Sequence, residues 1–145
     1  PSSKNLACVK HFINAFCYGG NENVGMHKLS FSSFRWYPVS YSGIDPEKFA
    51  VGYAKVQEFL VIFGGKEPIS RDIHYFNLEL LEWKKPEFLL LEVTLGMSAV
   101  ALNTDTILVY GGKEDTNFRT HAYLYKMNQF FVIPTYGVKP EIAFS

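Results

Sequence analysis

The sequence predicts an all-β fold built from three successive units of four antiparallel strands. The first observation is a repeat, in which an apolar stretch ends in two glycines at intervals of 45 and 47 residues. The three glycine pairs are Gly19-Gly20, Gly64-Gly65 and Gly111-Gly112. The second observation is that each unit divides into four short runs rich in β-branched or aromatic residues and bounded by turn formers. Four strands in a period of this size are typical of β-propeller blades.

The repeat divides residues 1–145 into one region of three blades, which cover approximately residues 3–48, 49–95 and 96–142. In the first blade, strands are expected over residues 6–10, 13–18, 26–31 and 34–39. The second blade is expected to have strands over 49–55, 59–63, 72–78 and 82–85, and the third over 97–102, 106–110, 121–127 and 130–134. An apolar run at residues 88–95 breaks the pattern and receives no assignment.

Aromatic residues recur near the end of each unit. Trp36 follows its glycine pair by 16 residues and Trp83 by 18, while Phe130 and Phe131 occupy that place in the third unit, where we take Phe131 as the repeat residue. In a propeller the outer strand is where neighbouring blades diverge, so these rings are expected to fill the wedge between blades. Small residues are expected on the first strand, where blades crowd together. The residues at that position are Ala7, Gly52 and Ala99.

The repeat resembles the kelch family. Residues 72–78, followed by Trp83, are similar to that family's third strand and closing tryptophan, and the resemblance extends over essentially the whole chain. The link between units, residues 43–47, recurs at 137–141 and is similar to links in the kelch domains of host cell factor and of a Rab effector. The chain departs from the family at the tryptophan of the third unit and at the third-strand tyrosine. The residues in place of that tyrosine are His27, His74 and Ala122.

Three blades cannot close a ring, and each end blade would expose an apolar face. Three alternatives remain open. The blades belong to a longer propeller, a different partner supplies the missing ones, or two copies of this chain associate into a six-bladed ring.

Composition and motifs disfavour several function classes. The formal net charge is zero and the basic residues are scattered, so nucleic-acid binding is not predicted. Apolar runs are far shorter than the ~20 residues that a membrane span requires, so no membrane partner is predicted either. The sequence has no Cys-x-x-Cys, His-Glu-x-x-His or Gly-x-Ser-x-Gly motif. His27, His74 and His121 recur every 47 residues, but equivalent positions on neighbouring blades lie too far apart for one metal ion. No metal or other cofactor is therefore expected.

The two cysteines, Cys8 and Cys17, both lie in apolar strand-like runs. We interpret them as small, unpaired core residues rather than as a disulfide. Few cysteines and the absence of a signal pattern favour an intracellular location, in the cytoplasm or nucleus.

Function is therefore sought on the loops, where a rigid scaffold usually presents its binding residues. The loops after the second strands carry basic and aromatic side chains of the kind that anchor interfaces. The predicted partner-binding residues are Lys66, Arg71, Lys113, Phe118 and Arg119. The sequence favours a non-catalytic kelch scaffold that binds a protein partner through this loop face or through open blade edges. The alternatives are a fragment of a propeller enzyme of the galactose-oxidase type and a structural subunit of a large assembly.

Overall fold

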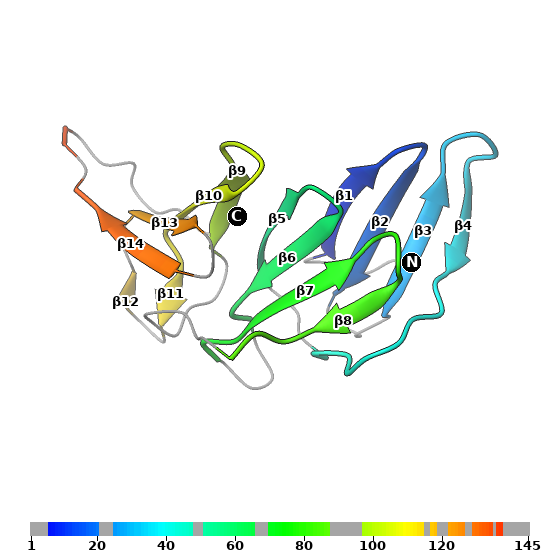
Figure 1. Cartoon of the computed structure of the whole chain (residues 1–145), viewed down its shortest axis with the longest axis horizontal. Coiled ribbons are helices and arrows are strands. Elements are labelled where there is room, and N and C mark those ends of the chain that lie inside the picture. The colour runs from blue at the N-terminus through cyan, green and yellow to red at the C-terminus, as the bar shows by residue number, and fades with distance from the viewer. Residues whose placement is uncertain are drawn as a thin grey trace.

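The computed structural model describes residues 6–20, 25–47, 51–65, 70–87, 97–114, 117–118, 122–126, 129–134 and 136–137, without the side chains of 113–130. All regular elements in these residues are β-strands, which confirms the predicted all-β class. Three four-stranded antiparallel sheets lie side by side, in the order in which they occur along the chain, and form a fan-shaped array (Figure 1). Nothing in the described part of the chain is a helix with the length and apolarity of a membrane span.

The three sheets follow one another along the chain. The N-terminal sheet consists of β1 (Leu6–His11), β2 (Asn14–Gly19), β3 (Met26–Ser30) and β4 (Arg35–Pro38) in that order. The middle sheet consists of β5 (Gly52–Val56), β6 (Phe59–Phe63), β7 (Ile73–Asn77) and β8 (Glu82–Lys84). The C-terminal sheet consists of β9 (Ser98–Ala101), β10 (Thr106–Tyr110), β13 (Ala122–Lys126) and β14 (Gln129–Ile133). A two-stranded ribbon, β11 (Lys113–Glu114) with β12 (Asn117–Phe118), was not expected from the sequence.

Sheet-forming segments lie within two or three residues of the positions that the periodic pattern predicts. Residues 59–63 and 106–110 are strands with the expected bounds, and the remaining strands differ only at their ends. The apolar run at residues 88–95 falls outside the described residues. Every glycine of the three pairs has a positive φ, between 60° and 103°, and each pair lies where the second strand of its sheet ends. This backbone conformation is strained for residues with a Cβ, which explains the recurrence of glycine.

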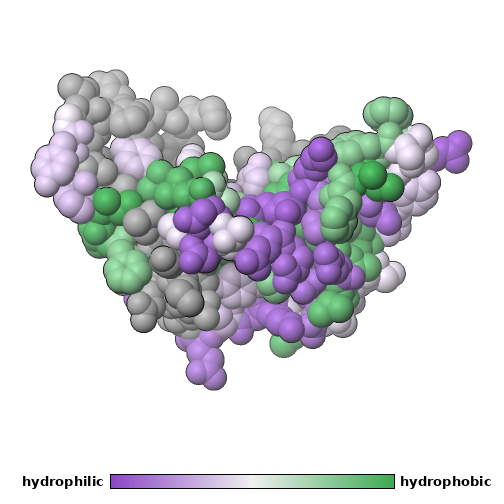
Figure 2. Space-filling model, turned by 45° about the horizontal axis from the view of Figure 1, so that its top comes forward, coloured by the Kyte–Doolittle hydropathy of each residue, from purple (hydrophilic) through white to green (hydrophobic). Residues whose placement is uncertain are grey.

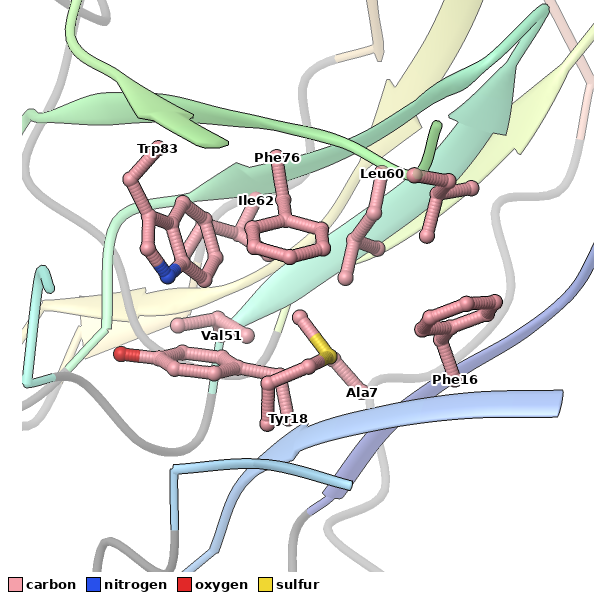
Figure 3. Close-up of a cluster of buried hydrophobic side chains, with 10 residues drawn as sticks. Ala7, Phe16, Tyr18, Val51, Leu60, Ile62, Phe76 and Trp83 are labelled. Atoms are coloured by element: carbon pink, nitrogen blue, oxygen red, sulfur yellow. The ribbon is translucent and has the colours of Figure 1, made fainter. Parts of the chain in front are cut away.

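Side chains alternate between the two faces of each strand, so each sheet contributes to the interfaces on both of its sides. Between the N-terminal and middle sheets lies a core whose buried rings and aliphatic chains come from both sheets (Figure 3). It contains Ala7, Phe16, Tyr18, Met26, Val51, Leu60, Ile62, Phe76, Leu78 and Trp83. A second core lies between the middle and C-terminal sheets. It contains Ala54, Val61, Phe63, Ile73, Met97, Ile107 and Val109.

Trp83 is central to the first core. Its side chain is 3% exposed and contacts two rings edge-on, Tyr18 of the N-terminal sheet at 4.6 Å and Phe76 of its own sheet at 4.9 Å between ring centroids. The ring therefore joins adjacent sheets, as Figure 3 shows.

The two cysteines form a disulfide, so their interpretation as unpaired core residues is wrong. The β1–β2 hairpin turns at residues 12–13, and its register places Cys8 opposite Cys17. Their Cα atoms are 4.1 Å apart because directly opposite residues of an antiparallel pair approach closely. Cys17 is buried and Cys8 is exposed.

Register also corrects two positions in the third unit. The turn between β9 and β10 is longer than the two-residue turns of the other sheets, so Ser98, not Ala99, stands opposite the residue before the glycine pair, as Ala7 and Gly52 do. A shift of one residue moves a side chain to the other face of a sheet. Ala99 therefore lies on the face of the C-terminal sheet that packs against the middle sheet, whereas Ser98 lies on the other face.

The other correction concerns the closing aromatic residue. Trp83 lies opposite Phe76, which lies opposite Leu60. The corresponding chain of pairs in the C-terminal sheet runs from Ile107 through Tyr125 to Phe130. The residue that matches Trp83 is therefore Phe130, and Phe131 belongs to the opposite face, where it is 50% exposed.

Candidate interaction surfaces

The residues predicted to bind a partner are only partly within the described chain. Arg71 is exposed just before β7, whereas Lys66 and Arg119 lie outside the described residues. Lys113 and Phe118 are opposite each other in the β11–β12 ribbon, so their backbones are adjacent, but their side chains are not described. The structure thus brings one pair of the predicted residues together.

In Figure 1 the ribbon and the segment before β7 both lie at the lower end of the sheets, where β6 and β10 finish. The β3–β4 turn, which precedes the exposed Arg35, lies at the upper end. The predicted loop face is therefore at one end of the fan.

A surface that sequence reasoning did not single out is the outer side of the N-terminal sheet. Ala7, Phe16 and Tyr18 face the middle sheet, so by alternation their neighbours in the strands face away from it. We call this side the N-terminal open face. Its positions, read from the strand pairing, are Cys8, Lys10, Ala15, Cys17, His27, Leu29, Trp36 and Pro38.

Trp36 occupies on this face the position that Trp83 occupies in the middle sheet. It lies opposite Leu29, as Trp83 lies opposite Phe76. Trp36 is nevertheless 44% exposed, because no sheet of the described chain covers its side of the N-terminal sheet. The expected packing of this ring between two sheets is therefore not found among the described residues.

The outer side of the C-terminal sheet is the second uncovered surface. Ile107 and Val109 pack on the middle sheet, so the alternate residues of β10 face outward. We call this side the C-terminal open face, with Val100, Leu108, Tyr110 and Phe131 as its apolar positions. Val100 and Phe131 are 54% and 50% exposed, and Leu108 and Tyr110 are half-buried. In Figure 2, hydrophobic residues lie among hydrophilic ones on both the N-terminal and C-terminal sides of the molecule.

The segment that leaves β4 strengthens the contact between the N-terminal and middle sheets. Ser42 forms a parallel bridge to β8, accepting a hydrogen bond from the Trp83 backbone and donating one to Leu81, each at 3.0 Å. Next to it, Gly43 has a φ of 83°, and a Cβ there would lie 2.3 Å from the Trp83 carbonyl oxygen. Only glycine fits this close approach of two backbones.

A carboxylate fixes the same segment from its other side. Asp45 Oδ1 accepts hydrogen bonds from the Tyr18 hydroxyl at 2.5 Å and from the Glu47 backbone at 2.8 Å, and Oδ2 accepts one from the Tyr41 hydroxyl. Burial, together with this hydrogen bond to Asp45, raises the pKa of Tyr41 to about 12. The Tyr41 hydroxyl therefore stays protonated as a donor at neutral pH, and the hydrogen bonds of Asp45 explain the cluster as a structural one.

Two other groups have displaced pKa values. Burial lowers the pKa of His11, aided by the charge of Lys55 and opposed by Glu79 and Glu58. Burial alone would raise the pKa of Asp72, but hydrogen bonds from Lys85 and Ser70 bring it below its ordinary value. The Lys85 Nζ to Asp72 Oδ1 distance is 2.8 Å, which ties β8 to the entry of β7.

Two of the three regularly spaced histidines, His27 and His74, lie on the third strands of their sheets. His74 is buried and His27 is half-buried, whereas His121 lies outside the described residues. Nδ1 of His27 has no hydrogen-bond partner among the described residues. Within the same part of the chain, no three His, Cys, Asp or Glu side chains gather as a candidate metal site.

Sequence signals existed for two of the missed features. A two-residue turn at residues 12–13 places residues whose numbers sum to 25 opposite each other, which pairs Cys8 with Cys17. The recurrence of tryptophan at positions 36 and 83 indicated a position that is buried between two sheets. Only the arrangement of the sheets shows that no described sheet covers Trp36.

The chain was compared with known proteins. A scan of protein-family models finds no match to this sequence, and no curated protein is significantly similar to it.

Proposed function

We propose that the chain is a non-catalytic interaction scaffold made of three kelch-type propeller blades, each corresponding to one four-stranded sheet. Supporting observations are the repeated strand order, the repeated glycine pairs with positive φ, and the burial of Trp83 between adjacent sheets. The observation that carries the proposal is that both end sheets present apolar residues on faces that no part of the described chain covers. Surfaces of this kind mark interaction sites.

A rigid fan of sheets would present its loops to a partner at a fixed geometry. We propose the end with Arg71 and the β11–β12 ribbon, which contains Lys113 and Phe118, as the binding face for a protein segment with acidic side chains, because arginine pairs with carboxylates through two parallel hydrogen bonds. Lys66 and Arg119, outside the described residues, remain predicted members of the same site. The intracellular location remains a prediction, and the disulfide removes one of its supports, since disulfides are rare in the cytosol.

The experiment is a binding measurement with an array of acidic peptides. Arg71→Glu should reduce binding at least about tenfold, because it replaces an attractive charge pair by a repulsive one. Arg35→Glu is the matched control, since Arg35 is also an exposed arginine but lies at the opposite end of the sheets. Equal loss in both variants, or none in either, would contradict the loop face. Unchanged thermal melting establishes that both variants are folded.

A further inference from the structure

The two open faces correspond to the two sides of an interface that the chain already contains. At the interface between the N-terminal and middle sheets, the second strand presents Tyr18 just before a glycine pair, and the outer strand of the next sheet presents Trp83 against it. On the C-terminal open face, Tyr110 stands just before the third glycine pair. On the N-terminal open face, Trp36 stands at the place of Trp83. The surfaces thus carry the two complementary halves of one contact.

The backbone repeats the same correspondence. Gly43 lies against the outer strand of the following sheet, where a Cβ would meet the Trp83 carbonyl. Its repeat counterpart, Gly137, also has a left-handed φ of 90°, yet a Cβ built on it would meet nothing within 4 Å. The residue before it, Tyr136, matches Ser42 and is 92% exposed. Gly137 therefore shares the left-handed φ of Gly43, but no strand of the described residues lies against it.

The outer strand that fits is β4. It is the edge of the N-terminal sheet and all four of its residues are exposed. Its turn residue Phe34 has a φ of 51°, matching the 53° of Leu81, which accepts the hydrogen bond from Ser42 at the covered interface. An exposed strand edge with unpaired backbone groups is a template for pairing with another segment.

The C-terminal open face cannot reach the N-terminal open face of its own chain, because the middle sheet stands between the two end sheets (Figure 1). We propose that a second copy of this chain covers both faces, head to tail, with Trp36 of one copy against Tyr110 of the other and the segment 136–137 along β4. Two such contacts related by a two-fold axis close a ring of six sheets. The proposal rests on the proposed blade architecture, but not on the peptide-binding loop face.

The test is the mass of the 145-residue chain in solution, measured by light scattering after gel filtration. The expected mass is twice the 16.5 kDa of one chain. A monomer with an intact far-ultraviolet circular dichroism spectrum would overturn the proposal, as would a mass that grows without limit, because head-to-tail contacts that do not close form open chains. Peptide binding sensitive to Arg71→Glu would survive either result, so the two proposals fail separately.

Variants test the pairing itself. Trp36→Glu and Tyr110→Lys should each give monomers, because each places a charge in both contacts of the dimer. An equimolar mixture of the two variants should restore the dimer, since the mixed dimer has one unaltered contact and one in which Glu faces Lys. A mixture that remains monomeric would contradict the proposed pairing.

Tyr37→Glu is the matched control. Tyr37 is 43% exposed, close to the 44% of Trp36, and is the next residue of β4, so it points to the opposite side of the strand. This variant should remain a dimer. If the Tyr37→Glu and Trp36→Glu variants were both monomeric, any charge on β4 would disrupt association. That result would overturn the assignment of the face.

A milder substitution covers the case in which charged variants fail to fold. A Cβ on Gly137 would meet no described atom within 4 Å, although the φ of 90° strains any residue that has one, and in the dimer this Cβ would also meet the backbone of β4. The dimer dissociation constant should rise at least about tenfold, and melting of the monomeric Tyr110→Lys variant with and without Gly137→Ala measures how much of the effect is strain within one chain. An unchanged dissociation constant would exclude the proposed position of residues 136–137.

Discussion

Trp83 and Trp36 hold the same place in consecutive sheets but have different surroundings. Trp83 is 3% exposed and packs on Tyr18 and Phe76, whereas Trp36 is 44% exposed on a face with no neighbouring sheet in the described chain. The strands beneath them are paired in the same way. The repeat therefore specifies the strand pairing within a sheet, whereas the contribution of its aromatic residue to the free energy of unfolding depends on whether a neighbouring sheet covers it.

The N-terminal open face is stabilised differently from the covered interface. At the covered interface, stabilisation comes from buried apolar area, from the Asp45 hydrogen bonds and from the bridge of Ser42 to β8. The open face lacks this packing but carries the Cys8–Cys17 disulfide across its two inner strands. A covalent cross-link constrains the unfolded chain, so it stabilises a sheet that has a neighbour on one face only.

The largest expected effect is at the covered interface. Trp83→Ala should lower the free energy of unfolding by about 3–5 kcal/mol, because it leaves a cavity between two sheets. Urea denaturation followed by circular dichroism measures this loss. A loss below about 1 kcal/mol would show that the ring does not hold the sheets together.

The second prediction concerns how much the Cys8–Cys17 disulfide stabilises the N-terminal sheet. Replacing Cys8 by Ser and Cys17 by Ala together should cost about 2–3 kcal/mol, because the nine-residue separation closes a short loop in the unfolded chain. Urea midpoints of the double variant and of the reduced parent protein should agree. If reduction leaves the midpoint unchanged, the open face is stabilised by something other than this cross-link.

The stability of the covered interface is expected to depend on pH through His11. His11 is buried and has a folded pKa below the 6.5 of an ordinary histidine, so the unfolded chain takes up a proton that the folded chain resists. The contribution of neutral His11 to stability is therefore complete above pH 6.5 and is lost as pH falls through the folded pKa. Urea midpoints at about pH 7.5 and about pH 5.5 measure it.

The control for the pH measurement is His11→Gln, which removes the titrating group and leaves the other histidines in place. The difference in stability between the two pH values should be smaller in this variant than in the parent protein. An equal difference would assign the pH dependence to other groups.

The smallest expected effect is that of Trp36 within one chain. In a Tyr110→Lys background, where the proposed contact between copies cannot form, Trp36→Ala should change the free energy of unfolding by no more than about 0.5 kcal/mol. Urea denaturation provides the measurement, alongside Trp83→Ala in the same background. Equal losses for the two tryptophans would remove the distinction between covered and open faces.

Much of the fold follows from local patterns in the sequence. Residues 59–63 and 106–110 have the apolar, β-branched character of buried strands, and a glycine pair follows each of them. The predicted site is harder, because Lys66 and Arg119 are outside the described residues, and among the described ones Lys113 and Phe118 are brought opposite each other. Loop positions depend on where the chain resumes its next strand, which a local pattern does not contain.

The local sequence pattern specified the order and approximate bounds of the four strands of each sheet, although not the β11–β12 ribbon, because strand formation depends on neighbouring residues and on turns. Tertiary structure decided which face each residue occupies: one longer turn moved Ala99 to the other face, and strand pairing assigned Phe130, not Phe131, to the place of Trp83. It also decided that Cys8 meets Cys17 and that Trp36 stays exposed. Pairing and burial join residues distant in sequence, so they are fixed only when the sheets pack against one another.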